Sequence, residues 1–182
     1  MKAGGFDCVI GNPPYGSTLG TEQEQHLRNR FGAFASAPDT YVAFAEQAHR
    51  LLRKEGRFGY IIPSACLGGP NYRKFREFLL GVCIESVVLL PFDVFKDAYI
   101  DTVLLTTRKS RPSADHEAIV YAYPKKEKIA SIDPSDLPMR RIRQTLWADT
   151  EDRKIMLQPE SAQLLARLRE RFPVRLEDAV YM

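Results

Sequence analysis

Short apolar runs alternate with amphipathic stretches along the first 110 residues, and this alternation predicts the order of secondary-structure elements. Apolar runs over 6–10, 57–63, 84–90 and 101–107 predict strands, and we expect the first two to be buried. Apolar residues at helical spacing predict helices over 38–54 and 71–80, and a short polar helix is expected over 21–30. Strands that alternate with helices in this way are typical of an α/β fold.

The helix predicted over 71–80 has an apolar side and a basic side. Its core-facing residues are expected to be Tyr72, Phe75, Phe78 and Leu79. Arg73, Lys74 and Arg76 are expected on the solvated side, where contact with a phosphate is the alternative. His49, on the helix over 38–54, is expected to be a packed or surface histidine rather than a metal ligand.

The pattern changes at residue 111, where Arg111-Pro112-Ser113 has the composition of a linker. Beyond it we expect a strand over 116–123, a charged turn at 125–128, a partly helical stretch over 134–145 and an amphipathic helix over 161–171. The sequence therefore predicts two units, an α/β unit over 1–110 and a short α+β extension over 111–182.

Composition limits the protein class but does not select a function. With 182 residues, 45% hydrophobic and 27% charged, the chain is long enough for one core and is not disordered. Its net charge of +3 permits nucleic-acid binding without arguing for it. Cys8, Cys66 and Cys83 lack metal-type spacing and are expected to be buried thiols. We see no signal peptide and no long apolar run, so we expect a cytoplasmic protein.

The candidate chemistry lies directly after the first predicted strand. Gly11 frees the backbone there, and Pro13 and Pro14 prevent either a strand or a helix from continuing. The result is a stiff loop at the carboxyl end of a strand, which is where open α/β sheets bind ligands. Within this loop Asn12 offers an amide and Tyr15 offers a flat aromatic ring.

These residue types suit the methylation of a planar amino nitrogen, which is a poor nucleophile because its lone pair is delocalised. Two acceptors that bind its N–H groups favour a more pyramidal and more reactive nitrogen. The Asn12 side-chain oxygen can be one acceptor and the Pro13 carbonyl the other. Tyr15 can stack on the ring that carries the amine, and the chemistry is then mostly positioning.

The run FDCVIGNPPYG resembles the catalytic motif of the S-adenosylmethionine-dependent amino-methyltransferases, above all the N6-adenine DNA methyltransferases of restriction-modification systems. GYIIPSACL followed by YRKFREFLL is similar to the next segment of the Eco57I-like and TaqI-like enzymes. PFDVFKDAYIDTVLLTTRK resembles a later motif whose phenylalanine stacks on the flipped adenine; here that residue is Phe95, with Phe92 a weaker candidate. The element order matches the second half of a class I, Rossmann-like methyltransferase sheet, with a reversed strand inserted at the edge.

The resemblance implies methylation of adenine N6 in double-stranded DNA, with the adenine flipped out of the duplex. Flipping costs a few kcal/mol, and stacking on Tyr15 and Phe95, worth about 1–3 kcal/mol per base, would offset it. Asn12 and Pro13 would bind the amine, while Pro14 stiffens the loop. S-adenosylmethionine would be the cofactor, with its adenine-side edge near Asn12 and Pro14. No metal is expected.

The same resemblance covers only the middle of a longer enzyme. The Gly-rich turn that binds the donor in this family is not found, and Gly68-Gly69 lacks the pattern. The run LLARLRERFPVRLEDAV resembles the bridge that leads into the target-recognition domain. We therefore expect a fragment that is inactive alone, and whose open sheet edge favours pairing with an upstream methyltransferase half or with itself.

Two alternative functions remain open at this point. The loop chemistry fits an amino-methyltransferase acting on a protein glutamine or an RNA base equally well. The alternative that is not an enzyme is a degenerate or split subunit, which serves as an interaction or DNA-binding module.

Overall fold

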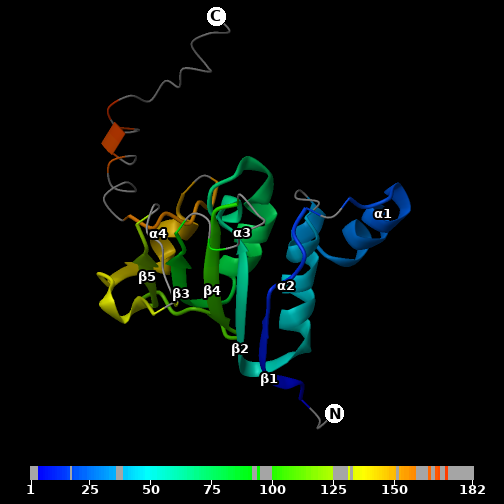
Figure 1. The fold of residues 1–182 in the computed structure, drawn as a ribbon, viewed down its shortest axis with the longest axis horizontal. Helices are drawn as coiled ribbons and strands as arrows, with labels where there is room; N and C mark the ends of the chain where they lie inside the picture. The colour runs from blue at the N-terminus through cyan, green and yellow to red at the C-terminus, as the bar shows by residue number, and fades with distance from the viewer. Residues whose placement is uncertain are drawn as a thin grey trace, which may run out of the picture.

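A computed structural model describes residues 4–171 except 17, 36–38, 92–93, 95–99, 125–130, 132, 151, 159–163, 165–166 and 169–170. Its strands form one mixed sheet (Figure 1). In chain order the main elements are β1 (Phe6–Gly11), α1 (Thr21–Arg30), α2 (Thr40–Leu51), β2 (Leu52–Pro63), α3 (Arg73–Leu80), β3 (Cys83–Leu89), β4 (Thr102–Arg108), β5 (Glu117–Ala122), β6 (Arg140–Arg143) and α4 (Gln144–Ala148). The predicted α/β class is therefore confirmed.

The six strands lie in the order β1-β2-β4-β3-β5-β6. β4 runs antiparallel to both of its neighbours, β2 and β3, so the predicted reversed strand is confirmed. Its predicted place at the edge is wrong, because β4 lies between β2 and β3 with Val103 and Leu105 fully buried. β5 and β6 continue the sheet past residue 110, and the domain division at that residue stays a prediction.

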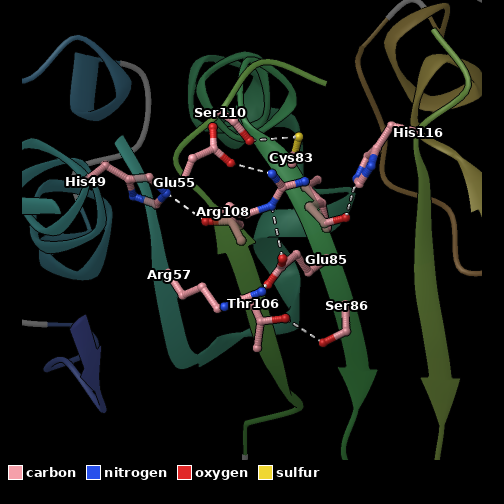
Figure 2. A network of polar contacts seen from close by, with 12 residues as sticks. His49, Glu55, Arg57, Cys83, Glu85, Ser86, Thr106, Arg108, Ser110 and His116 are labelled. Atoms are coloured by element: carbon pink, nitrogen blue, oxygen red, sulfur yellow. Dashed lines mark hydrogen bonds and ion pairs between the residues drawn. The ribbon is translucent and has the colours of Figure 1, made fainter. Parts of the chain in front are cut away.

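One face of the sheet holds the main core. Residues of α2, α3 and α4 pack there against β2, β3 and β4 in a single cluster, which includes Ala45, Phe75, Trp147, Phe58 and Leu105. Strand side chains alternate between the two faces, and the opposite face carries a smaller apolar cluster around Val88, Leu90 and Tyr123 together with polar side chains. Figure 2 shows its network, in which Glu85 pairs with Arg57 and Arg108, and Thr106 bonds Ser86.

Two predicted boundaries and one predicted helix are corrected. α2 ends at Leu51 and not near Lys54, because β2 begins at Leu52. Gly56 lies inside β2 and not at the helix end. At this position in β2 a Cβ atom would meet the Phe6 carbonyl oxygen at 3.0 Å. Residues 140–143 form β6 rather than a helix, since Ile142 is buried opposite Ala118 while the arginines on either side of it are exposed.

β1 is an edge strand, and its predicted burial is wrong. Phe6 is 47% exposed and Ile10 is 79% exposed. Cys8 is exposed as well, whereas Cys66 and Cys83 are buried as predicted. The reason is that, among the described residues, only β2 pairs with β1. The apolar composition of β1 did not indicate which neighbours cover the strand.

Arg76 is fully buried, which contradicts its predicted place on a solvated, phosphate-contacting surface. Its guanidinium donates to three backbone carbonyls, those of Cys66 (3.1 Å), Gly69 (2.7 Å) and Asp152 (2.9 Å). Arg73 and Lys74 on the same helix are exposed, as predicted, and both pair with Glu77. Arg76 therefore joins α3 to two separate chain segments and is not available to DNA.

His49 is buried in the core, so of its two predicted places the packed one is confirmed. Its Nδ1 lies 2.9 Å from the Ala45 carbonyl oxygen, and its Nε2 lies 2.7 Å from the Thr107 hydroxyl. The ring packs against Phe58 with a centroid separation of 4.6 Å. A neutral ring that donates from Nδ1 and accepts at Nε2 satisfies both contacts. Burial lowers the pKa of His49 below its ordinary value.

The lowered pKa of His49 predicts that the free energy of unfolding falls as the pH falls below about 6.5. The unfolded chain takes up a proton there that the folded chain resists, so the stabilisation is present above this pH and is lost below it. Urea unfolding between pH 7.5 and 5.5 measures the effect, with a slope of up to about 1.4 kcal/mol per pH unit from this group. The slope should decrease in His49→Gln and persist in His26→Gln, which changes an exposed histidine; equal slopes in all three proteins would contradict the assignment.

No helix in the described part of the chain combines the length and the apolar character needed to cross a membrane.

Candidate active site

The loop after β1 stands at the carboxyl end of the edge strand. Pro13 is buried, Asn12 and Pro14 are exposed, and Tyr15 is half-buried. Gly16 follows with a φ of +61°, a conformation that residues with a Cβ atom rarely adopt. The turn at Gly16 and the two prolines keep the loop short and stiff, so its polar groups are displayed at one place.

Asn12 and Tyr15 contact each other directly. The Tyr15 hydroxyl donates to the Asn12 side-chain oxygen and also lies 3.2 Å from the Ile61 carbonyl oxygen in β2. A hydroxyl has one proton, so it can serve only one of these two acceptors fully at a time. The amide oxygen has two lone pairs, and a second donor can therefore bind Asn12 while Tyr15 remains in place.

Burial raises the pKa of Tyr15 above its ordinary value of 10.0. Its hydroxyl is therefore protonated near neutral pH and acts as a donor. The ring meets the ring of Tyr41 edge to face, with centroids 6.3 Å apart. Tyr15 is thus anchored on one side by β2 and on the other by α2.

The two proline carbonyls of the loop differ in their contacts. The Thr40 hydroxyl donates to the Pro14 carbonyl oxygen at 2.8 Å. Among the described residues, no such donor contacts the carbonyl of Pro13. Of the two, the Pro13 carbonyl is therefore the one without a donor from the described residues.

The sequence-predicted residues Asn12, Pro13, Pro14 and Tyr15 come together in this loop, while their predicted roles as acceptors, stacking ring and cofactor contacts stay predictions. Phe95 and its weaker alternative Phe92 lie outside the described residues. Their predicted stacking on a base also stays a prediction.

Sequence reasoning missed the residues that support the loop from α2. The sequence placed Thr40 and Tyr41 only within the helix predicted over 38–54, which Pro38-Asp39-Thr40 was expected to cap. Asp39 does occupy the capping position, but its side chain accepts a hydrogen bond from the Tyr72 hydroxyl and none from the helix. The available signal was positional, since a helix that follows a β-strand loop begins at the same edge of the sheet.

A shallow hollow of about 490 Å³ lies beside the loop, between α1 and α2. Thr40 and Phe44 line it from α2, and Leu19 and Leu27 line it from the other side. Its lining is almost entirely apolar. Among the described residues, no group of three or more histidine, cysteine, aspartate or glutamate side chains could hold a metal ion.

Comparison with known proteins gives a family match in sequence and a fold match in structure. The model of the family described as Eco57I restriction-modification methylase matches residues 1–95. A putative type II restriction enzyme and methyltransferase of Methanocaldococcus jannaschii is 36% identical over 136 residues, which are 73% of this chain and 11% of that protein. The type II methyltransferase M.BstVI of Geobacillus stearothermophilus is 25% identical over a match of 192 aligned positions. The match covers 97% of this chain and 34% of that protein.

Among solved structures, a putative class I S-adenosylmethionine-dependent methyltransferase of Listeria monocytogenes superposes with a TM-score of 0.52 and 21% identity. The match covers 67% of this chain and 38% of that one. The sheet described above is therefore of the class I methyltransferase type. The chain spans only about a tenth to a third of the length of these two curated relatives.

Proposed function

The chain belongs to the Eco57I restriction-modification methylase family, and from that premise we propose that its Asn12–Tyr15 loop binds the target amine in a methyltransferase that modifies adenine N6 in DNA. The observation that carries this proposal is the arrangement of acceptors in the loop. The Asn12 oxygen keeps a free lone pair beside Tyr15, and the Pro13 carbonyl is left unused by the described residues while Thr40 holds the carbonyl of Pro14.

In the proposed mechanism, Asn12 and Pro13 each accept one N–H of the adenine amine. Hydrogen bonds from both N–H groups to two fixed oxygens favour a pyramidal nitrogen. Its lone pair is then less delocalised into the purine ring and more reactive. The Tyr15 hydroxyl keeps the Asn12 amide oriented with its oxygen toward the amine, and its ring offers a face on which the base can stack. Holding the amine in one orientation supplies most of the rate enhancement.

The fold and the family imply S-adenosylmethionine as the methyl donor, which when bound supplies an already activated methyl group. The exposed side chains of Asn12 and Pro14 suit contact with one edge of such a donor, because they lie at the carboxyl end of β1. Further contacts to the donor are expected from residues outside this chain's described part.

Double-stranded DNA with a flipped adenine is the proposed substrate. The arginines of β6 (Arg140, Arg141 and Arg143) are exposed and suit contact with phosphates. The exposed β1 edge, with Phe6 and Ile10, suits pairing with an upstream methyltransferase half or with a second copy. A cytoplasmic location, and inactivity of these 182 residues alone, remain part of the proposal.

Mass spectrometry of DNA nucleosides tests the proposed function. The complete reading frame that contains these residues is expressed in cells that lack DNA methylation, and the digested DNA is compared with DNA from cells carrying an empty vector. The expected result is N6-methyladenine above background. Methyl groups on cytosine, on RNA or on protein glutamine in its place would contradict the adenine assignment, and no methylated product at all would favour a non-catalytic subunit.

A further inference from the structure

The first turn of α2 contacts the Asn12–Tyr15 loop at two points. The Thr40 hydroxyl donates to the Pro14 carbonyl oxygen at 2.8 Å, and the Tyr41 ring meets the Tyr15 ring edge to face at 6.3 Å. Thr40 and Tyr41 are both buried. Two adjacent residues of one helix therefore hold two adjacent residues of the loop.

This helical turn is itself firmly held. The Tyr41 ring stacks on Tyr72 with centroids 6.1 Å apart and meets Phe75 edge to face at 6.0 Å. The Tyr72 hydroxyl donates to the Asp39 carboxylate, one residue before Thr40. Contacts with α3 and with the turn before it thus limit how far Thr40 can move.

The loop has a specific need for an outside donor. Pro13 and Pro14 have no N–H groups, so neither residue can fix its own backbone by donating a hydrogen bond. Any hydrogen bond to the backbone of Pro13 and Pro14 themselves must therefore be accepted by their carbonyls. Thr40 supplies one to Pro14, and this leaves the carbonyl of Pro13 as the acceptor for a ligand.

Resting on the proposed function, we propose that Thr40 is a positioning residue for the amine: its hydroxyl fixes the Pro14 carbonyl and thereby sets the spacing between the Asn12 oxygen and the Pro13 carbonyl. The substrate class that this spacing serves is a planar amine with two N–H groups. Thr40 does not contact the amine and acts only through the loop.

Three substitutions separate positioning from simple packing. Thr40→Val keeps the branched shape and removes the hydroxyl, whereas Thr40→Ser keeps the hydroxyl. Thr106→Val is the matched control, because the Thr106 hydroxyl also takes part in a hydrogen bond, with Ser86 at 2.6 Å (Figure 2). Both valine variants lose a hydroxyl that bonds a neighbour, but only Thr40→Val should affect the loop.

A readout that does not need activity is the side-chain NH₂ signal of Asn12 in a proton–nitrogen correlation spectrum of this chain. The signal is assigned by its absence in Asn12→Ala. We expect it to shift in Thr40→Val and to keep its wild-type position in Thr40→Ser and Thr106→Val. An unshifted signal in Thr40→Val overturns the proposal, whether or not the protein transfers a methyl group.

The kinetic readout uses the protein from the complete reading frame and an adenine-containing DNA. Thr40→Val should lower kcat about tenfold, the upper range for one neutral hydrogen bond. Thr40→Ser should restore kcat. A kcat loss in Thr40→Val no larger than in Thr106→Val overturns the positioning role. If the Asn12 signal shifts as expected but wild-type protein methylates nothing, the proposed function fails and the role of Thr40 in shaping the loop stands.

Discussion

Asn12→Ala should lower kcat for methyl transfer to adenine about 100- to 1000-fold, the usual effect of removing one group that stabilises a transition state. The substitution removes the proposed acceptor of the amine and also frees the Tyr15 hydroxyl, whose remaining partner among the described residues is the Ile61 carbonyl. Because Asn12 is exposed, the fold should be unaffected. Single-turnover transfer of a radioactive methyl group from S-adenosylmethionine to DNA measures the effect.

Two further variants interpret that result. Asn12→Asp keeps an oxygen acceptor and should retain more activity than Asn12→Ala. Asn29→Ala, which changes an exposed asparagine on α1, should have wild-type kcat. Methyl transfer by Asn12→Ala within about threefold of wild type, on the scale of one weak hydrogen bond, would show that Asn12 is not an amine acceptor.

Arg76→Met should lower the free energy of unfolding by about 3–5 kcal/mol, as expected when three buried or partly buried carbonyls lose their donors. Methionine fills much of the same space, but it leaves the carbonyls of Cys66, Gly69 and Asp152 without their donors. Each buried carbonyl without a donor costs about 1–3 kcal/mol. Urea unfolding of the purified chain at neutral pH measures the loss.

Arg73→Met is the matched control, three residues earlier on the same helix. Arg73 is exposed and pairs with Glu77 at 3.2 Å, so its loss should cost less than about 1 kcal/mol. Similar losses for the two variants would mean that Arg76 is not the junction between α3 and the segment at Asp152.

Local periodicity predicted the elements well, because it depends on residues that are close in the sequence. The polar helix at Thr21–Arg30 was predicted with its observed bounds. Facts that depend on distant residues were not predictable in the same way. The burial of Arg76 depends on a carbonyl 76 residues away, and the interior place of β4 depends on which strands flank it.

In the candidate site, too, the residues that are close in the sequence were predictable and the distant ones were not. Asn12, Pro13, Pro14 and Tyr15 are contiguous, so the sequence displayed them together. Thr40 comes 26 residues after Pro14, and a threonine at the start of a helix has an ordinary local explanation. Only the folded chain shows that its hydroxyl is turned toward the loop.

Whether the Asn12–Tyr15 loop holds an exocyclic amine is tested most directly by the affinities of two single-stranded oligonucleotides for the purified protein. They differ in one base, adenine in the first and purine, which lacks the amino group, in the second. We expect adenine to bind about tenfold more tightly, as two hydrogen bonds to the amine would give, and Asn12→Ala to weaken this preference, since only the Pro13 carbonyl then accepts from the amine. Equal affinity of the wild-type protein for both oligonucleotides would contradict amine recognition by the loop.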